Sequence, residues 1–335
     1  MSRPVEPKDA VSRLALLVVL VIYASNVSAA LVGSAPPANA ENKKTDAATA
    51  AEHAQKLSAV YQSVAPEDEK GFQRMAQPKL GEWLARVHEP AISFEDYCAS
   101  SPVRSTVERH TLVLQPLGHL NEQEQEVLSM LKDYAEAFFE LPARIEPPLE
   151  LVSPDKNVSL VRLGPRDRHG NAESRYEAEK VNTHVLLPHL PADALLYIGI
   201  ASADLWADDG GVFGYASLEN RTGVCSFYRI FPKFWEKRKA DEKLPLMRRA
   251  CRLLAHETGH MLGLSHCIFY HCTMNGCQGL AEADATPLHY CPVCERKLRW
   301  NLAYDPEKRG TRLQEFYTKY GMTTEADWWK TRAVK

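Results

Sequence analysis

Short apolar runs separated by polar turns divide much of this chain into predicted strands. Four of these runs are 110–118 (HTLVLQPLG), 194–206 (ALLYIGIASADLW), 210–217 (GGVFGYAS) and 222–230 (TGVCSFYRI). Runs of this length, rich in branched and aromatic side chains and bounded by Gly, Pro or Asn, are typical of strands buried in a sheet. The polar segment 164–180 lies between two of them and is expected to form a polar loop or excursion.

Two longer segments have the apolar periodicity of helices. Asn121 can cap a helix that runs to about Glu140, before the Pro-rich residues 146–151. A second helix is predicted over 243–264, with Pro245 in its first turn and Gly263 where a helix can end. The final 20 residues are expected to be helical and peripheral. The order strand, helix, strands, helix predicts an α/β fold with a mixed sheet.

The first 45 residues have a different composition. Three basic residues precede an apolar stretch at 14–30, which ends in small side chains. This pattern resembles a secretory signal, and the stretch is also long enough for membrane attachment through residues 14–30. Residues 31–55, rich in Ala and Asn, are interpreted as a linker into a helical extension.

Composition and charge limit the function classes. The chain has 335 residues, 45% of them hydrophobic, which is enough for one large domain or two smaller ones. Its net charge is −3 at pH 7, with no long run of like charge. We therefore expect no nucleic-acid partner, because such binding usually needs a clustered basic face.

The stretch HETGHMLGLSHC, residues 256–267, has the spacing of a metal site. His256 and His260 lie one turn apart on the same face of the predicted helix, as two ligands of one zinc ion require. Gly263 allows a sharp reversal that can return His266 as a third ligand. Glu257 lies beside these ligands, where it can take a proton from a zinc-bound water.

Five of the eight cysteines lie between residues 267 and 294. Cys267, Cys272, Cys291 and Cys294 can form a closed four-thiolate zinc site. Cys277, His271 or His289 can replace one of the four, and disulfides or buried thiols are the alternative interpretation. Cys98, Cys225 and Cys251 are expected to be buried thiols.

These motifs together resemble the archaemetzincins, a family of metzincin zinc metallopeptidases, and in particular its eukaryotic members. The resemblance rests on the motif H-E-x-x-H-x-x-G-x-x-H at 256–266, the adjacent Cys267, Met274 and the C-x-x-C motif at 291–294. The stretches 81–97, 111–118, 200–206 and 211–217 are also similar, so the resemblance covers about 65–305. The spacing from Met274 to Cys291 is one residue shorter than the family usually has.

The resemblance implies a metzincin-like mixed twisted sheet with an active-site helix and a small zinc-bound cysteine-rich subdomain at 267–294. Together with the signal- or anchor-like leader and linker at 1–45, which the family does not lead one to expect, we predict the division 46–109 helical extension, 110–305 metallopeptidase domain and 306–335 helical tail. Two zinc ions per chain are implied, a catalytic ion on His256, His260 and His266 and a structural ion on Cys267, Cys272, Cys291 and Cys294.

The resemblance also implies how the site works. Glu257 would be the general base, and Met274 would form the turn beneath the catalytic metal. Gly214, Tyr215 and Ala216 would lie on an edge strand that pairs with an extended peptide or protein substrate. The implied activity is aminopeptidase-like cleavage of short peptides.

Several alternatives stay open on the sequence. A zinc-stabilised binding or scaffold protein and a small-molecule amide hydrolase are the rival functions. The leader favours the secretory pathway or a membrane anchor, whereas the thiolate site and the family favour the cytosol or nucleus. Natural substrate, exo- or endopeptidase specificity and oligomeric state are not determined.

Overall fold

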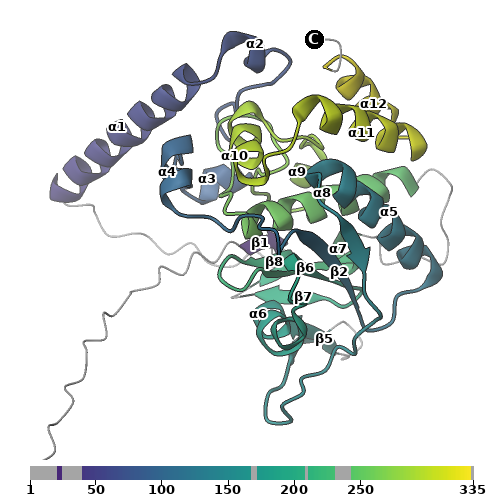
Figure 1. Ribbon diagram of the computed structural model, residues 1–335. Helices are drawn as coiled ribbons and strands as arrows, with labels where there is room; N and C mark the ends of the chain where they lie inside the picture. Colours follow the sequence, from purple (N-terminus) through teal and green to yellow (C-terminus); the bar gives the residue numbers. More distant parts are fainter. Residues whose placement is uncertain (1–20, 25–39, 167–171, 208–209, 231–242, 333–335) are drawn as a thin grey trace, which may run out of the picture.

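A mixed β-sheet with helices on both faces forms the centre of the protein (Figure 1). The computed structural model describes residues 21–24, 40–166, 172–207, 210–230 and 243–332. The main strand order is β3-β2-β6-β9-β8-β7-β5-β4. The bounds are β2 Thr111–Leu117, β3 Ala143–Ile145, β4 Val161–Arg166, β5 Ala172–Glu177, β6 Ala194–Ala201, β7 Leu205–Ala207, β8 Gly210–Ser217 and β9 Thr222–Ser226.

The sheet combines parallel and antiparallel pairs, as the sequence predicted. Strand β2 runs parallel to β3 and β6, and β6 runs parallel to β9. Strand β8 then runs antiparallel to both β9 and β7. The predicted α/β fold class is therefore confirmed.

Strand β6 shows how the sheet separates two apolar cores. Leu196 and Ile198 belong to the core beneath α5 (Glu122–Phe139) and α8 (Lys243–Met261). Tyr197 and Ala201 belong to the opposite core, beneath α6 (Ala178–Lys180) and η1 (Val181–Leu186). Successive side chains of a strand point to opposite faces, so a strand buried on both sides is apolar throughout.

Short helices and a helical C-terminal region complete the fold. On the N-terminal side lie α1 Ala40–Gln62, α2 Pro66–Glu69, α3 Trp83–Arg86 and α4 Phe94–Ala99. The remaining helices are η2 Leu187–His189, α7 Phe227–Ile230, α9 Leu280–Asp284, α10 Pro292–Leu302, α11 Pro306–Lys319 and α12 Thr323–Lys330. Helix α1 therefore starts inside the segment interpreted as a linker.

The C-terminal helices are not peripheral, which corrects the expectation for the last 20 residues. Tyr317 of α11 is fully buried, and its ring lies 6.3 Å from that of Tyr134 on α5. Arg309 is also buried, and its Nη1 donates to Glu295 at 2.8 Å. Polar residues lie between these buried side chains along the chain. The hydrophobic pattern alone therefore does not predict the buried face of these helices.

The two predicted helices form where expected. Asn121 caps α5 through its side chain, which accepts from the backbone N–H of Glu124 at 3.0 Å, while the Glu124 side chain accepts from the Asn121 N–H. This reciprocal pair satisfies two backbone donors that the first turn of a helix leaves free. Helix α8 ends at Met261, and Gly263 follows with a φ of +85°.

Two predicted strands are shorter than expected. The run 194–206 is interrupted after Ala201, because Asp204 turns inward to pair with Arg229 at 2.6 Å. The run 222–230 ends at Ser226, whose hydroxyl accepts from the Tyr228 N–H at 3.1 Å and begins α7. In both places a buried polar side chain redirects the backbone.

The predicted loop at 164–180 is wrong for most of its length. Strands β4 and β5 pair as an antiparallel hairpin, and β5 continues into the sheet by pairing Tyr176 with Leu205 of β7. Leu163 on β4 is 70% exposed, so this hairpin lacks the apolar alternation that predicts a strand. Its position in the sheet depends on pairing with β7 rather than on its own sequence.

Strand β8 also pairs with a short segment from the apolar leader, β1 (Val21–Ala24). Tyr215 of β8 pairs with Val224 of β9 and with Val21 of β1. Val212 pairs in the same way with β7 and with β1, so β1 lies on the edge of β8 opposite both β9 and β7. The rest of the predicted signal or anchor at 14–30 lies outside the described residues. Within the described part of the chain, no helix has the length and apolar character needed to cross a membrane.

Candidate metal centres

Helix α8 brings the first two histidines of the motif together. His256 and His260 are fully buried, and their Nε2 atoms lie 3.0 Å apart. Their rings are 4.6 Å apart between centroids. Two ring nitrogens bound to one zinc ion lie about 3.3 Å apart in a tetrahedral site, so this spacing fits a shared metal.

The turn after α8 returns the third histidine to this pair. The Gly263 N–H donates to His260 O at 2.8 Å and the Leu264 N–H donates to Gly259 O at 2.9 Å, which is a Schellman ending with glycine in the left-handed region. The ring of His266 then lies 5.2 Å from that of His256 and 5.0 Å from that of His260.

The outer nitrogen of each ring is held by the protein. His256 Nδ1 lies 2.9 Å from Thr273 O, His260 Nδ1 lies 2.7 Å from Leu264 O, and His266 Nδ1 lies 2.6 Å from the Glu89 carboxylate. Donation from Nδ1 to these acceptors leaves each Nε2 with its lone pair available. Within the described residues, the Nε2 of His266 is buried without a hydrogen-bond partner.

The donor set fits a zinc ion. The three histidines offer ligand atoms that all lie within 4.8 Å of one another. Burial and the neighbouring imidazoles lower the pKa of His256 well below its usual value, and burial lowers the pKa of His260 to about 3. The imidazoles of His256 and His260 are therefore neutral at physiological pH, which is the form that binds metals.

Glu257 follows His256 on α8 and lies against Gly214 of β8. Its side chain is buried, and neither carboxylate oxygen has a hydrogen-bond partner among the described residues. A Cβ at Gly214 of β8 would lie 2.6 Å from Glu257 Oε1. Burial raises the pKa of Glu257 to about 8. A buried carboxyl without partners, next to a metal-type donor set, is suited to proton transfer.

Gly214, Tyr215 and Ala216 lie on β8 as predicted, with their backbones paired to β9. The side chain of Tyr215 packs into the core beneath η1, and Ala216 packs into the core beneath α8. Only the backbone of these residues is therefore placed to contact an added strand.

Met274 lies against α8 on the side of the histidines. It is fully buried, and a Cβ at Gly259 would lie 2.4 Å from its sulfur. The Met274 sulfur therefore approaches α8 at Gly259, which lies between His256 and His260 in the sequence. The Cys267 N–H donates to Met274 O at 2.8 Å, so the same turn is tied to the segment that carries His266.

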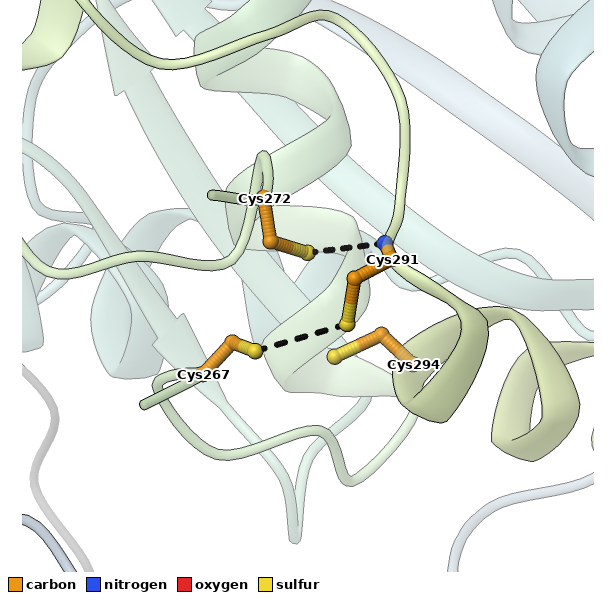
Figure 2. A group of neighbouring side chains, drawn as sticks. All are labelled: Cys267, Cys272, Cys291 and Cys294. Carbon is orange, nitrogen blue, oxygen red and sulfur yellow. Dashed lines mark hydrogen bonds between the residues drawn. The ribbon is translucent and has the colours of Figure 1, made fainter. Parts of the chain in front are cut away.

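A second cluster contains four cysteines (Figure 2). Cys267, Cys272, Cys291 and Cys294 are buried, and their sulfurs lie within 4.8 Å of one another. Cys267 and Cys291 have their sulfurs 3.5 Å apart, far beyond the roughly 2.05 Å of a disulfide. Sulfurs around one zinc lie about 3.8 Å apart. His266 faces the histidine group and its neighbour Cys267 faces this cluster.

The cysteine cluster lies at the start of α10. Cys291 is the N-cap, Pro292 occupies the first turn and Cys294 follows in the same turn. The positive end of a helix favours thiolate over thiol. Burial opposes ionisation of Cys267, yet its hydrogen bonds with the other three cysteines lower its pKa well below the usual value. Burial raises the pKa of Cys291, and the hydrogen bond with Cys267 raises that of Cys294, so without a metal the cluster favours one thiolate. The arrangement fits a four-thiolate metal site.

The proposed substitutes for these four ligands lie elsewhere. Cys277 is outside the group, and burial raises the pKa of its thiol. The ring of His289 stacks on Trp328 at 3.9 Å. Cys225 and Cys251 are buried free thiols, as expected, whereas Cys98 is only partly buried.

Sequence reasoning missed three residues that support the sites. Glu89 accepts from His266, and the indole N–H of Trp83 donates to the same Glu89 oxygen at 2.7 Å. Burial opposes ionisation of Glu89, but its interactions with His266 and the hydrogen bond from Trp83 together outweigh burial and lower the Glu89 pKa. Asn275 ties the cysteine loop by donating to Cys267 O at 2.7 Å. None of these three residues belongs to a sequence motif with the spacing of metal ligands, so the sequence alone does not single them out.

Comparisons with known proteins agree with the sequence motifs. Residues 193–300 match the family model Peptidase family M54. Archaemetzincin-2 of Rattus norvegicus is 28% identical over 271 residues, covering 71% of this chain and 72% of its own length. Archaemetzincin of Thermococcus kodakarensis is 39% identical over 112 residues, covering 33% of this chain and 59% of its own.

A solved archaemetzincin structure from Methanopyrus kandleri has a TM-score of 0.46 and 21% identity, covering 60% of this chain and 99% of that one. That likeness is too low to place individual residues. The sequence matches confirm the predicted resemblance to archaemetzincins, and with it the enzyme class, a zinc metallopeptidase.

Proposed function

We propose that this zinc metallopeptidase binds its catalytic ion through His256, His260 and His266 and uses Glu257 as its proton-transfer group. One observation carries the proposal. Three buried histidines direct Nε2 toward one point, and the unpartnered carboxylate of Glu257 lies beside them. Burying such groups is costly unless they bind something, and a dication would take the three histidine nitrogens as ligands.

Zinc held by these histidines would supply a Lewis acid that polarises the scissile carbonyl and makes water more acidic. Three protein ligands are the number that leaves a position for substrate or water. The contacts of Nδ1 with Thr273 O, Leu264 O and Glu89 support this assignment, because they keep the three rings oriented without the metal.

Glu257 would take the proton from the attacking water and then deliver it to the leaving amine. Such proton transfer contributes about 10²–10⁴-fold to the rate. The carboxylate is buried against Gly214, so it cannot rotate freely toward solvent. Its fixed position supports a role that needs one oxygen close to both the water and the departing nitrogen.

The outer edge of β8 is proposed to bind the substrate backbone. That edge already pairs antiparallel with β1 at Gly211, Val212 and Tyr215. An edge that accepts an extended segment of its own chain has the hydrogen-bonding groups that an extended peptide needs. Gly214 lies within this stretch and next to Glu257, so a peptide paired there would pass the catalytic group.

We further propose a second, structural zinc on Cys267, Cys272, Cys291 and Cys294. Four thiolates close the coordination sphere and leave no position for chemistry. The cluster joins the loop after α8 to the start of α10. Its support comes from the spacing and burial of the four sulfurs.

The preferred reaction is proposed to be aminopeptidase-like cleavage of short peptides. This finer part rests on the family resemblance. Free and N-acetylated versions of the same peptide test it directly, because an enzyme that recognises a free amino terminus should cleave only the free version.

The main experiment compares the full chain with Glu257→Gln on a mixed peptide library, with products read by mass spectrometry. Gln has the shape of Glu but cannot accept a proton at neutral pH, so a loss of about 10²-fold or more is expected while zinc content stays the same. Equal cleavage by both proteins would refute the role of Glu257. Zinc binding without cleavage by either would favour a scaffold or a small-molecule hydrolase.

A further inference from the structure

The hydrogen-bond partners of the three histidines differ in one respect. His256 and His260 are held by neutral backbone carbonyls, Thr273 O and Leu264 O. His266 alone is held by a carboxylate, Glu89, at 2.6 Å. We propose that Glu89 is a positioning residue for the catalytic zinc, acting through His266. This inference rests on the proposed role of His266 as a zinc ligand.

Glu89 is itself held in place by a second donor. The indole N–H of Trp83 donates to Glu89 Oε1 at 2.7 Å, the same oxygen that His266 contacts. Glu89 is 7% exposed and Trp83 is 4% exposed. A largely buried carboxylate with two donors on one oxygen keeps one orientation, which in turn fixes the ring of His266.

Trp83 is anchored by two further contacts. Its backbone N–H donates to the Glu282 carboxylate at 2.9 Å. Its indole lies against Gly276, where a Cβ would come within 2.5 Å of the ring. The indole also meets the ring of His266 edge-on, with 5.2 Å between centroids. Trp83 therefore covers the pair formed by Glu89 and His266.

A carboxylate on the outer nitrogen of a metal-bound histidine fixes the tautomer and increases the basicity of the metal-binding nitrogen. Removing such a partner typically lowers metal affinity by about 10–100-fold. Neutral imidazole ligands do not balance the positive charge of a zinc ion, and Glu89 supplies a negative charge close to it. We therefore expect Glu89 to increase zinc retention in addition to positioning the ring.

The location of Glu89 gives the N-terminal part of the chain a function. Residues 83–89 lie outside the segment 193–300 that matches the peptidase family model. They nevertheless contact the third histidine of the motif. The segment that leads from α3 to α4 is thus part of the metal centre rather than an independent extension.

The test is metal affinity in Glu89→Gln, measured on the full chain by titrating the metal-free protein with Co²⁺ and with Zn²⁺. Gln has the same size but brings an amide in place of the anion. Affinity at the histidine site should fall about 10–100-fold. Thiolate-to-cobalt charge transfer at the four-cysteine site serves as an internal control and should be unchanged.

Glu282→Gln is the matched control, because it also changes a carboxylate that holds Trp83 but one that does not contact His266. It should bind metal at the histidine site like the wild type. Wild-type affinity in Glu89→Gln, or equal losses in both variants, would overturn the positioning role.

If Glu89→Gln loses the cysteine-site signal through misfolding, Glu89→Asp decides. It keeps the charge but shortens the reach to His266, so affinity at the histidine site should still fall, and no fall would overturn the inference. The proposed function fails separately, if the wild type binds no metal at the histidines.

Discussion

Replacing Gly214 with Ala should reduce catalysis without removing zinc. A Cβ at this position would lie 2.6 Å from Glu257 Oε1 and 2.7 Å from its Cδ, whereas ordinary contact begins at 3.4 Å. The Glu257 carboxylate or strand β8 must therefore move by about 0.8 Å. A displacement near 1 Å in a catalytic group can lower the rate by about 10²-fold.

The stability cost of Gly214→Ala should be moderate. Overpacking a buried site costs about 1–3 kcal/mol, and the strand conformation of Gly214 is accessible to alanine because its φ is not positive. The histidines are not touched, so zinc content should equal that of the wild type. The effect should therefore be in kcat for a cleaved peptide, with a smaller change in the denaturation midpoint.

The assay measures kcat and KM on one peptide, together with zinc content and thermal unfolding. Gly279→Ala is the control, because Gly279 is extended and a Cβ there would meet no atom within 4 Å. It should behave like the wild type. A Gly214→Ala enzyme with wild-type kcat would refute both the close approach of β8 to Glu257 and the reasoning built on it.

Three further changes test other contacts. Gly259→Ala would bring a Cβ within 2.4 Å of the Met274 sulfur, so it should lose about 1–3 kcal/mol of unfolding free energy even though alanine favours helices; a gain in stability would contradict this packing. Cys294→Ser should remove the proposed structural zinc and lower the thermal midpoint, whereas Cys98→Ser, at a partly buried thiol outside the cluster, should do neither. Deleting residues 1–39 should free the β8 edge from β1 and raise kcat/KM on peptides at constant zinc content; an unchanged value would mean that β1 does not compete with substrate.

Features within a few residues of one another could be predicted from the sequence. The spacing of His256 and His260 on one helix, the break at Gly263 and the cap at Asn121 depend on local backbone geometry, and each is present. The buried strands β2 and β8 were also predicted, because residues buried on both faces of a sheet are apolar without interruption. The hairpin of β4 and β5 was missed because it has no such pattern.

Spacing along the chain alone determined the donor types, two candidate clusters and the motif that resembles archaemetzincins. Only the tertiary structure decided that Cys277 lies outside the cysteine group, and that Glu89 reaches His266 across 177 positions of sequence. It also decided that the backbone of Gly214 lies against Glu257. Helix and strand periodicity describes which side of an element a residue occupies. Which distant element lies opposite is set by packing of the whole chain. The contacts of His256 with Thr273 and of His266 with Glu89 therefore carry no local signal, whereas that of His260 with Leu264 lies within about one helical turn.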